Sequence, residues 1–87
     1  MTAKQAKAII GHPDVIFAYT ALAYVNLTDR ELELLILRHM RGHTQEVTAE
    51  EMELSVNGVQ KIEAVALRKC CAVWPKLNFV KSQLTCG

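Results

Sequence analysis

The run from Thr48 to Ile62 constrains the fold of this chain more than any other stretch, because its pattern indicates a helix, a tight turn and a second helix. Small Ala49 stands within the first of these helices, where another helix can cross closely. Glu53 falls in the expected turn, and Ser55 is a residue type that caps the N-terminus of a helix. The run therefore predicts a helix-turn-helix whose second helix starts at Ser55.

The second predicted helix has two unlike faces. Apolar and small residues recur in steps of three and four, which places on one side Val59, Ile62, Ala66, Cys70 and Val73. We expect this side to face the core. The opposite side carries amides, cations and one small residue, namely Asn57, Gln60, Lys61, Ala64 and Arg68. Amides and cations are the groups that contact base edges and phosphates, so this side is a candidate nucleic-acid surface.

Length and composition favour a small helical domain. A chain of 87 residues forms one domain and buries only about two-thirds of the surface that its unfolded form exposes. Half of the residues are apolar, few are aromatic and only four are glycine, a composition typical of a compact helical protein rather than a sheet or a disordered tail. We predict an all-α fold, a compact helical domain of four to six helices with a helix-turn-helix.

The remaining helices follow from capping and punctuation signals. Residues 1–11 form a plausible short helix with a glycine stop, and Asp14 can cap a helix that runs to residue 26. Thr28 and Glu31 have the spacing of a capping box and predict a helix that ends near Gly42; Thr44 or Thr48 caps the next one. The single domain 1–87 thus divides into an N-terminal helical extension (1–26), a helix-turn-helix core (27–74), and a C-terminal helix and tail (75–87).

The helix predicted over residues 14–26 is apolar nearly all round, so it must be buried on more than one side. Either the monomer buries it fully, or a second chain covers part of it. The last helix has a single apolar stripe, which could form a dimer seam or close the core of the monomer. The residues predicted at a dimer or partner interface are Phe17, Tyr24, Leu77, Val80 and Leu84.

Charge restricts how such a domain could bind nucleic acid. The whole chain has a net charge of +1, and residues 27–71 hold six basic against eight acidic side chains, a net charge of −2. Any binding to duplex DNA must therefore depend on a local cationic face, and affinity for arbitrary sequences should be weak. The acidic residues also favour an alternative, a protein-interaction surface made of Glu46, Glu50, Glu51 and Glu53.

Two stretches resemble a known family. Leu27 to Leu35 resembles the opening of region four of bacterial sigma factors and of the LuxR-type helix-turn-helix, which both begin Leu-Thr/Ser-x-Arg-Glu. Val59 to Lys69 resembles the sigma-factor run Val-x-x-Ile-Glu-x-x-Ala-Leu-x-Lys. The intervening residues align without a gap, so the resemblance covers residues 27–71 and leaves out the N-terminal helix and the tail.

The resemblance implies a four-helix DNA-reading domain whose last motif helix enters the major groove. Carried across by position, it places a recognition helix at Ser55 and puts base or phosphate contacts at Asn57, Gln60 and Lys61. The basic end of the family motif falls on Arg68 and Lys69. LuxR-type domains pair through their last helix, which implies a homodimer.

The chain also departs from the family pattern. Glu53 stands where the family prefers glycine in the turn, and Thr48 where it prefers an aliphatic residue. Val56 and Gly58 occupy positions that are often polar or basic. Gly58 allows a close approach to the helix, either by a nucleic-acid backbone or by a neighbouring helix.

Other classes of function have little support in the sequence. No residue set has the spacing of a catalytic triad or of a phosphate-binding loop, so we expect neither an enzyme nor a cofactor. His39 and His43 stand four apart, but Gly42 should end the helix between them and no third ligand is near, so we expect no metal. Three cysteines without framework spacing, no secretory signal and no apolar run approaching ~18 residues predict a cytoplasmic protein without a membrane span.

The sequence thus predicts a sequence-specific transcriptional regulator that binds double-stranded DNA as a homodimer through a recognition helix over residues 55–70. The predicted DNA-binding residues are Ser55, Asn57, Gln60, Lys61, Ala64, Arg68 and Lys69. The alternative is a protein-interaction module that contacts RNA polymerase, a sigma factor or another transcription factor.

Overall fold

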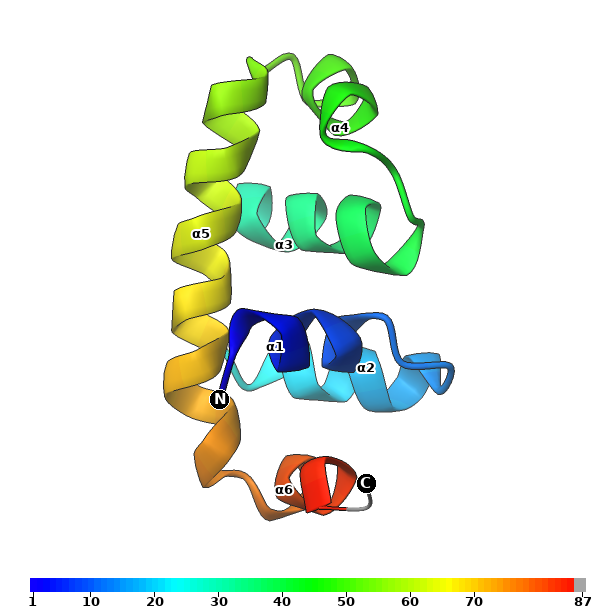
Figure 1. The fold of residues 1–87 in the computed structure, drawn as a ribbon, viewed down its shortest axis with the longest axis vertical. Coiled ribbons are helices and arrows are strands. Elements are labelled where there is room, and N and C mark those ends of the chain that lie inside the picture. The colour runs from blue at the N-terminus through cyan, green and yellow to red at the C-terminus, as the bar shows by residue number, and fades with distance from the viewer. Residues whose placement is uncertain (86–87) are drawn as a thin grey trace.

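The elements of the structure, a computed structural model that describes residues 1–85, are all helical (Figure 1). In chain order they are α1 (Ala3–Ile10), α2 (Val15–Ala23), α3 (Asp29–Leu35), the π-helical turn η1 (Ile36–Met40), α4 (Gln45–Glu51), α5 (Val56–Val73), the 3-10 turn η2 (Trp74–Lys76) and α6 (Asn78–Thr85). The predicted all-α fold with a helix-turn-helix is confirmed. No helix in the described range is long and apolar enough to cross a membrane.

Side-chain caps set where most helices begin. The capping box predicted at Thr28 forms, because its hydroxyl accepts from the Glu31 backbone N–H while its own N–H donates to the Glu31 carboxylate. Asp14 caps α2 as expected. Of the two candidates for α4, Thr44 is the cap. Thr48 is fully buried instead, and its hydroxyl donates to the Thr44 carbonyl at 2.8 Å.

Helix α5 is the longest helix and runs along one side of the molecule (Figure 1). Helices α1, α3 and α4 all pack against it, while α1 also contacts α2 and η1. The shared core holds Leu34, Leu35, Val59 and Trp74, all fully buried. The Trp74 indole N–H donates to the Ala21 carbonyl at 2.8 Å, which ties the end of α5 to α2.

The buried side of α5 differs in part from the predicted one. Ala66 and Cys70 are fully buried as expected, but Ile62 and Val73 are only half-buried. Glu63 and Leu67 take their place and are 6% exposed each. The burial of a carboxylate in this position is possible because Glu63 has polar partners on η1, as described below.

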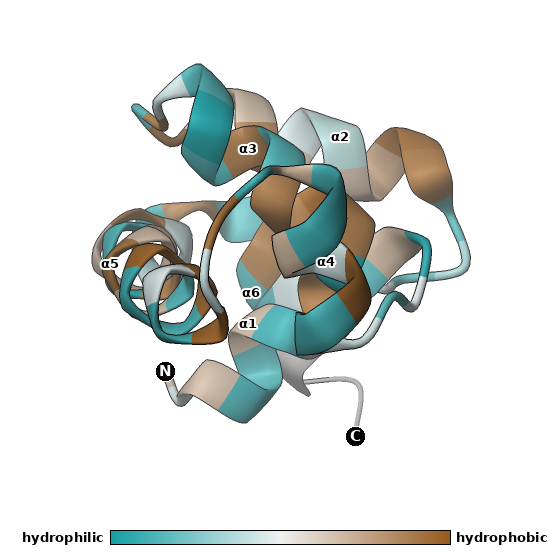
Figure 2. Ribbon diagram, turned by 90° about the horizontal axis from the view of Figure 1, so that it is seen from above, coloured by the Kyte–Doolittle hydropathy of each residue, from teal (hydrophilic) through white to brown (hydrophobic). Residues whose placement is uncertain are grey.

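Helix α2 is not fully buried by the monomer. Ala18, Ala21 and Leu22 face the core, but Val15, Ile16 and Tyr19 are 56%, 76% and 50% exposed. We call these three exposed residues the α2 apolar face. The start of α2 lies on the side of the molecule opposite α5, where the ribbon is coloured hydrophobic (Figure 2).

The residues predicted at a dimer or partner interface have different environments. Val80 is fully buried in the core of the monomer, so its side chain is not available to a second chain. Leu77 and Phe17 are half-buried, and Phe17 packs edge-on against Phe79, with ring centroids 5.9 Å apart. Tyr24 is 58% exposed and also lies beside Phe79. The side chain of Leu84 lies outside the described part of the structure.

Candidate nucleic-acid interface

The turn between α4 and α5 closes the helix-turn-helix. Glu53 adopts a left-handed conformation with φ of 56°, and the next backbone N–H, that of Leu54, donates to the Ala49 carbonyl at 2.8 Å. Ala49 is buried at this crossing. Ser55 then caps α5, because its hydroxyl accepts from the Gly58 backbone N–H at 3.0 Å. The turn and the cap lie where the sequence predicts them.

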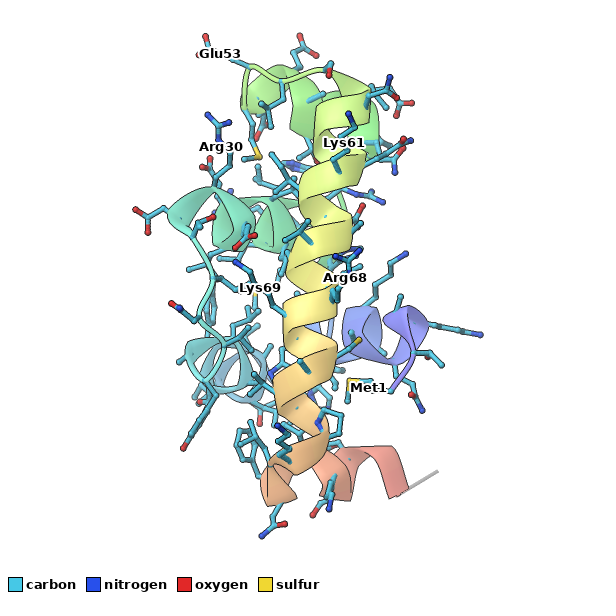
Figure 3. All side chains as sticks on the ribbon, turned by 90° about the vertical axis from the view of Figure 1, so that its left-hand side faces the viewer. Met1, Arg30, Glu53, Lys61, Arg68 and Lys69 are labelled. Carbon is cyan, nitrogen blue, oxygen red and sulfur yellow. The ribbon has the colours of Figure 1, made fainter. Side chains whose placement is uncertain are left out.

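The solvent side of α5 carries cations and an amide but no exposed carboxylate. Asn57, Lys61, Ala64 and Arg68 are all exposed, and Glu63, the one acidic residue of α5, is buried. Neither Lys61 nor Arg68 forms an ion pair within residues 1–85. Both side chains lie along the same side of the helix (Figure 3). We call Asn57, Lys61, Ala64 and Arg68 the α5 outer face.

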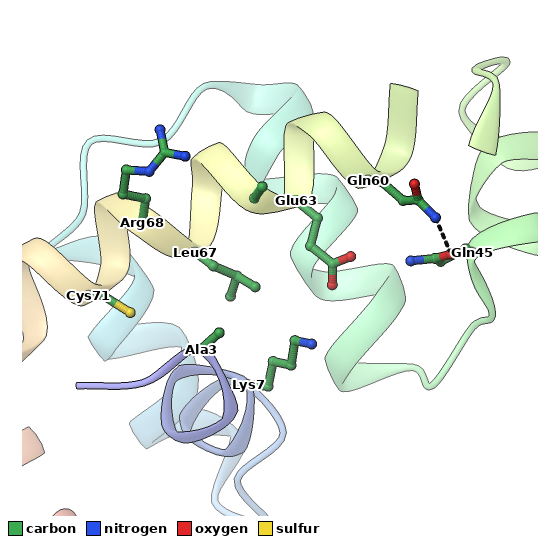
Figure 4. A pocket seen from close by; sticks show the side chains of 9 residues that line it. Ala3, Lys7, Gln45, Gln60, Glu63, Leu67, Arg68 and Cys71 are labelled. Atoms are coloured by element: carbon green, nitrogen blue, oxygen red, sulfur yellow. Dashed lines mark hydrogen bonds between the residues drawn. The ribbon is translucent and has the colours of Figure 1, made fainter. Parts of the chain in front are cut away.

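Gln60 lies at the edge of the α5 outer face and is attached to α4. Its side-chain amide donates to the Gln45 side-chain oxygen at 3.0 Å (Figure 4). The bond holds the first residue of α4 beside α5 and restricts the orientation of the Gln60 amide. The remaining N–H and the oxygen of that amide can still serve an outside partner.

Lys69 points to α3 rather than along the α5 outer face. Its ammonium donates to the Glu31 carboxylate at 2.8 Å. This hydrogen bond, together with the one from the Thr28 backbone N–H, lowers the pKa of Glu31. Lys69 thus supports the capping box of α3. The sequence predicts that Lys69 and Arg68 act together, but in the structure the two side chains do not share one face.

A polar cluster around the buried Glu63 joins η1 to α5, and sequence reasoning missed it. The His39 Nε2 and Glu63 Oε1 atoms are 2.6 Å apart, and the Arg38 Nε atom lies 3.7 Å from the same oxygen. The His39 hydrogen bond and the Arg38 charge lower the pKa of Glu63. The available signal was spacing, since Glu63 stands four residues after Val59 and so shares its buried side.

The two histidines considered as metal ligands serve different carboxylates. His43 Nδ1 lies 3.7 Å from Glu51 on α4, while His39 contacts Glu63. The His43 backbone carbonyl accepts a 2.7 Å hydrogen bond from the Arg38 guanidinium. Over the described range, no group of three or more histidine, cysteine or acidic side chains is placed to hold a metal ion.

The surroundings of Gly58 test one of its two interpretations, the close approach of a neighbouring helix. A β-carbon at this position would meet the Ser55 hydroxyl at 3.2 Å and the Leu54 β-carbon at 3.8 Å. Both atoms belong to the preceding turn and cap, and no neighbouring helix has an atom among these contacts. Glycine here is therefore not explained by close packing against another helix.

Comparison with known proteins places this geometry in a family. The family model for sigma-70, region 4, matches residues 25–71, which is more than half of the chain and includes α3, η1, α4 and most of α5. No curated protein and no solved structure gives a significant match. Helices α1, α2 and α6 lie outside the matched residues. The chain belongs to the sigma-70 region 4 family of DNA-binding helix-turn-helix domains.

Proposed function

We propose that this protein is a sequence-specific transcriptional regulator that places α5 in the major groove of double-stranded DNA. The observation that carries the proposal is the α5 outer face, which presents Asn57, Lys61 and Arg68 without an exposed carboxylate. Residues 27–71 have a net charge of −2 overall, so this face is a local exception. It provides the cationic surface that DNA binding requires.

Each group on the face has a distinct role in this proposal. Asn57 lies in the first turn of α5 and can form a bidentate contact to adenine, which contributes ~1–3 kcal/mol of discrimination. Gln60 can read a base edge in the same way. Lys61 and Arg68 contact phosphates, and about 16 Å of helix separates Asn57 from Arg68 at ~1.5 Å per residue.

The acidic residues outside α5 favour selective over general binding. Glu46, Glu50, Glu51 and Glu53 are exposed on α4 and the turn and would repel a duplex that approaches from that side. The same acidic surface favours the alternative function, a module that contacts RNA polymerase or another transcription factor through a basic partner surface.

We further propose that the protein acts in the cytoplasm as a homodimer. The α2 apolar face supports the dimer, because three large apolar side chains remain exposed on a helix that has no charged residue. Two copies of such a face can pack on each other without burying a charge. Because the start of α2 lies on the side of the molecule opposite α5 (Figures 1 and 2), a dimer formed through the α2 apolar face would leave both α5 outer faces accessible to DNA.

Binding-site selection from random duplexes, followed by a mobility-shift assay on the selected sequence, tests the proposal. Replacing both Lys61 and Arg68 by alanine should abolish retention of the selected duplex at low salt. A matched control replaces Arg41 and Lys76 by alanine, since these exposed cations carry the same charge but lie off α5. Retention unchanged by the α5 double variant would show that the proposed face is wrong.

Binding assays with duplex DNA and with core RNA polymerase distinguish the DNA-binding regulator from the protein-interaction module. If the wild type retains no duplex but binds purified core RNA polymerase, and replacing Glu46, Glu50 and Glu51 by glutamine weakens that binding, the interaction module is the better description. Tight binding to the selected duplex with no affinity for the polymerase would exclude this alternative for that partner.

A further inference from the structure

A groove runs beside the α5 outer face. It has a volume of about 490 Å³ and lies between α5, α1 and the start of α4 (Figure 4). Gln60, Ala64 and Arg68 of α5 line it on one side, with Gln45 from α4 and Lys7 from α1 across from them. Three residues predicted to contact DNA thus also line a groove that extends to a helix outside the family match.

The charge of this groove is positive. Its one carboxylate, Glu63, is already hydrogen-bonded to His39 and lies near Arg38. Lys7 also acts on Glu63 from across the groove, since its charge contributes to the lowered pKa of that carboxyl. Lys7 is exposed and forms no hydrogen bond or ion pair with any residue that the structure describes. The Lys7 ammonium is therefore available to an anion from outside.

We infer that this groove receives the sugar-phosphate backbone of the bound duplex and that Lys7 contacts a phosphate there. The inference rests on the proposed function. A duplex on the α5 outer face must pass over the groove, because the two share Ala64 and Arg68. Small Ala3 and Ala64 leave the groove open, and the Gln45 and Gln60 amides can donate to phosphate oxygens. Helix α1 would thereby extend the DNA interface beyond residues 25–71.

The salt dependence of DNA binding tests this inference. Each phosphate contact that is lost makes the plot of log affinity against log salt concentration less steep by about 0.9. We expect Lys7→Ala to show this change between 50 and 200 mM salt on both the selected duplex and a random one, because a phosphate contact does not depend on sequence. Lys7→Arg should keep the wild-type slope. Lys76→Ala, which removes an exposed cation beyond the end of α5, is the matched control and should leave the slope unchanged.

The outcomes separate this inference from the proposed function. If Lys7→Ala keeps the wild-type slope while Lys61→Ala and Arg68→Ala flatten it, the role of Lys7 is overturned and the function of α5 stands. A loss of affinity by one constant factor at every salt concentration, or a loss of helical circular dichroism, would indicate a structural effect and also overturn the phosphate contact. A wild type that retains no duplex at the lowest salt overturns both proposals.

Discussion

Glu53 is the one described residue other than glycine with a positive φ, and it stands where the sequence family prefers glycine. A left-handed conformation costs an L-residue ~1–2 kcal/mol, which glycine avoids at the price of a more flexible unfolded chain. We expect Glu53→Gly to raise the free energy of unfolding by about 1 kcal/mol in urea titration. Glu50→Gly removes a carboxylate from the same surface but lies within α4, so it should lower that free energy by about 1 kcal/mol. A lower free energy of unfolding for Glu53→Gly than for the wild type would show that the backbone at Glu53 is not strained.

Glu63 makes the fold sensitive to acid. Its pKa is lowered in the folded state, so its contribution to stability is fully present above the ordinary pKa of 4.5 and is lost as the pH falls through the folded value. We expect Glu63→Gln to lower the free energy of unfolding by about 1–3 kcal/mol at pH 7, because a charge-assisted hydrogen bond to His39 is lost. The difference between the two proteins should shrink below pH 4.5.

Urea titrations between pH 3 and pH 7 measure this difference. Glu46→Gln is the control, because it removes an exposed carboxylate and leaves the His39–Glu63 contact intact. A constant gap between wild type and Glu63→Gln over the whole pH range would show that the stability loss is not linked to the ionisation of Glu63.

Single residues differ in how far the sequence determines them. Thr28, Ser55 and Glu53 were predicted in their roles because caps and turns depend on neighbours within four residues. The partners of Lys69 and Glu63 could not be predicted in this way, since Glu31 and His39 lie 38 and 24 positions away and meet them only through tertiary packing. Glu31 and Glu63 are both buried, so counting their carboxylates as surface charge overstates the acidity of the exposed surface of residues 27–71.

At the scale of the element, the N-terminus of α5 has two roles, one in stability and one in the proposed DNA contact. Ser55 caps the helix and is also a predicted DNA contact, and two substitutions separate these roles. Ser55→Ala should lower the free energy of unfolding by about 1 kcal/mol through loss of the cap. Ser55→Asp should keep the cap and the stability but weaken duplex binding, because its carboxylate would repel phosphates.

Thermal unfolding and mobility-shift titrations on the two Ser55 variants check this prediction. If Ser55→Asp binds the selected duplex as tightly as the wild type, the start of α5 lies away from DNA. The result would leave the cap intact and contradict the docking of this helix end in the major groove.

Helix periodicity predicts the existence and orientation of α5 but not the centre of its buried side. Ile62 and Glu63 are adjacent, and apolar character favoured Ile62 as the core residue. The structure rotates the buried side toward Glu63 and Leu67, because η1 brings a histidine and an arginine to that position. Whether a carboxylate can be buried depends on such partners, which local pattern does not show.

At the scale of the molecule, charged and apolar surfaces lie on different sides. The cationic α5 outer face and the start of α2, which carries the exposed Val15 and Ile16, are on opposite sides of the structure, and α4 with its exposed acidic residues lies at one end (Figures 1 and 3). The sequence left open whether the monomer buries the apolar helix over residues 14–26 fully or a second chain covers part of it. It could not predict that Val15, Ile16 and Tyr19, rather than Val80, would be left exposed, because that depends on how α6 packs.

The exposed α2 apolar face leads to a prediction about assembly. Ile16 is 76% exposed, so Ile16→Lys removes little buried surface from the monomer and should change its free energy of unfolding by less than about 0.5 kcal/mol. In a dimer packed through α2, the same substitution would place two ammonium groups in an apolar contact, which is strongly unfavourable. Sedimentation velocity over a range of concentrations should therefore show a wild-type dimer and an Ile16→Lys monomer.

The location of the seam determines the control for this experiment. Ala8→Lys places a new cation at an exposed position of α1, so it adds the same charge away from the α2 apolar face and should sediment as the wild type does. A wild type that stays monomeric at every concentration would exclude the homodimer, and a dimer that survives Ile16→Lys would place the seam elsewhere. Because the start of α2 lies on the side of the molecule opposite α5 (Figures 1 and 2), loss of the dimer should leave the affinity of one α5 outer face for a single half-site unchanged.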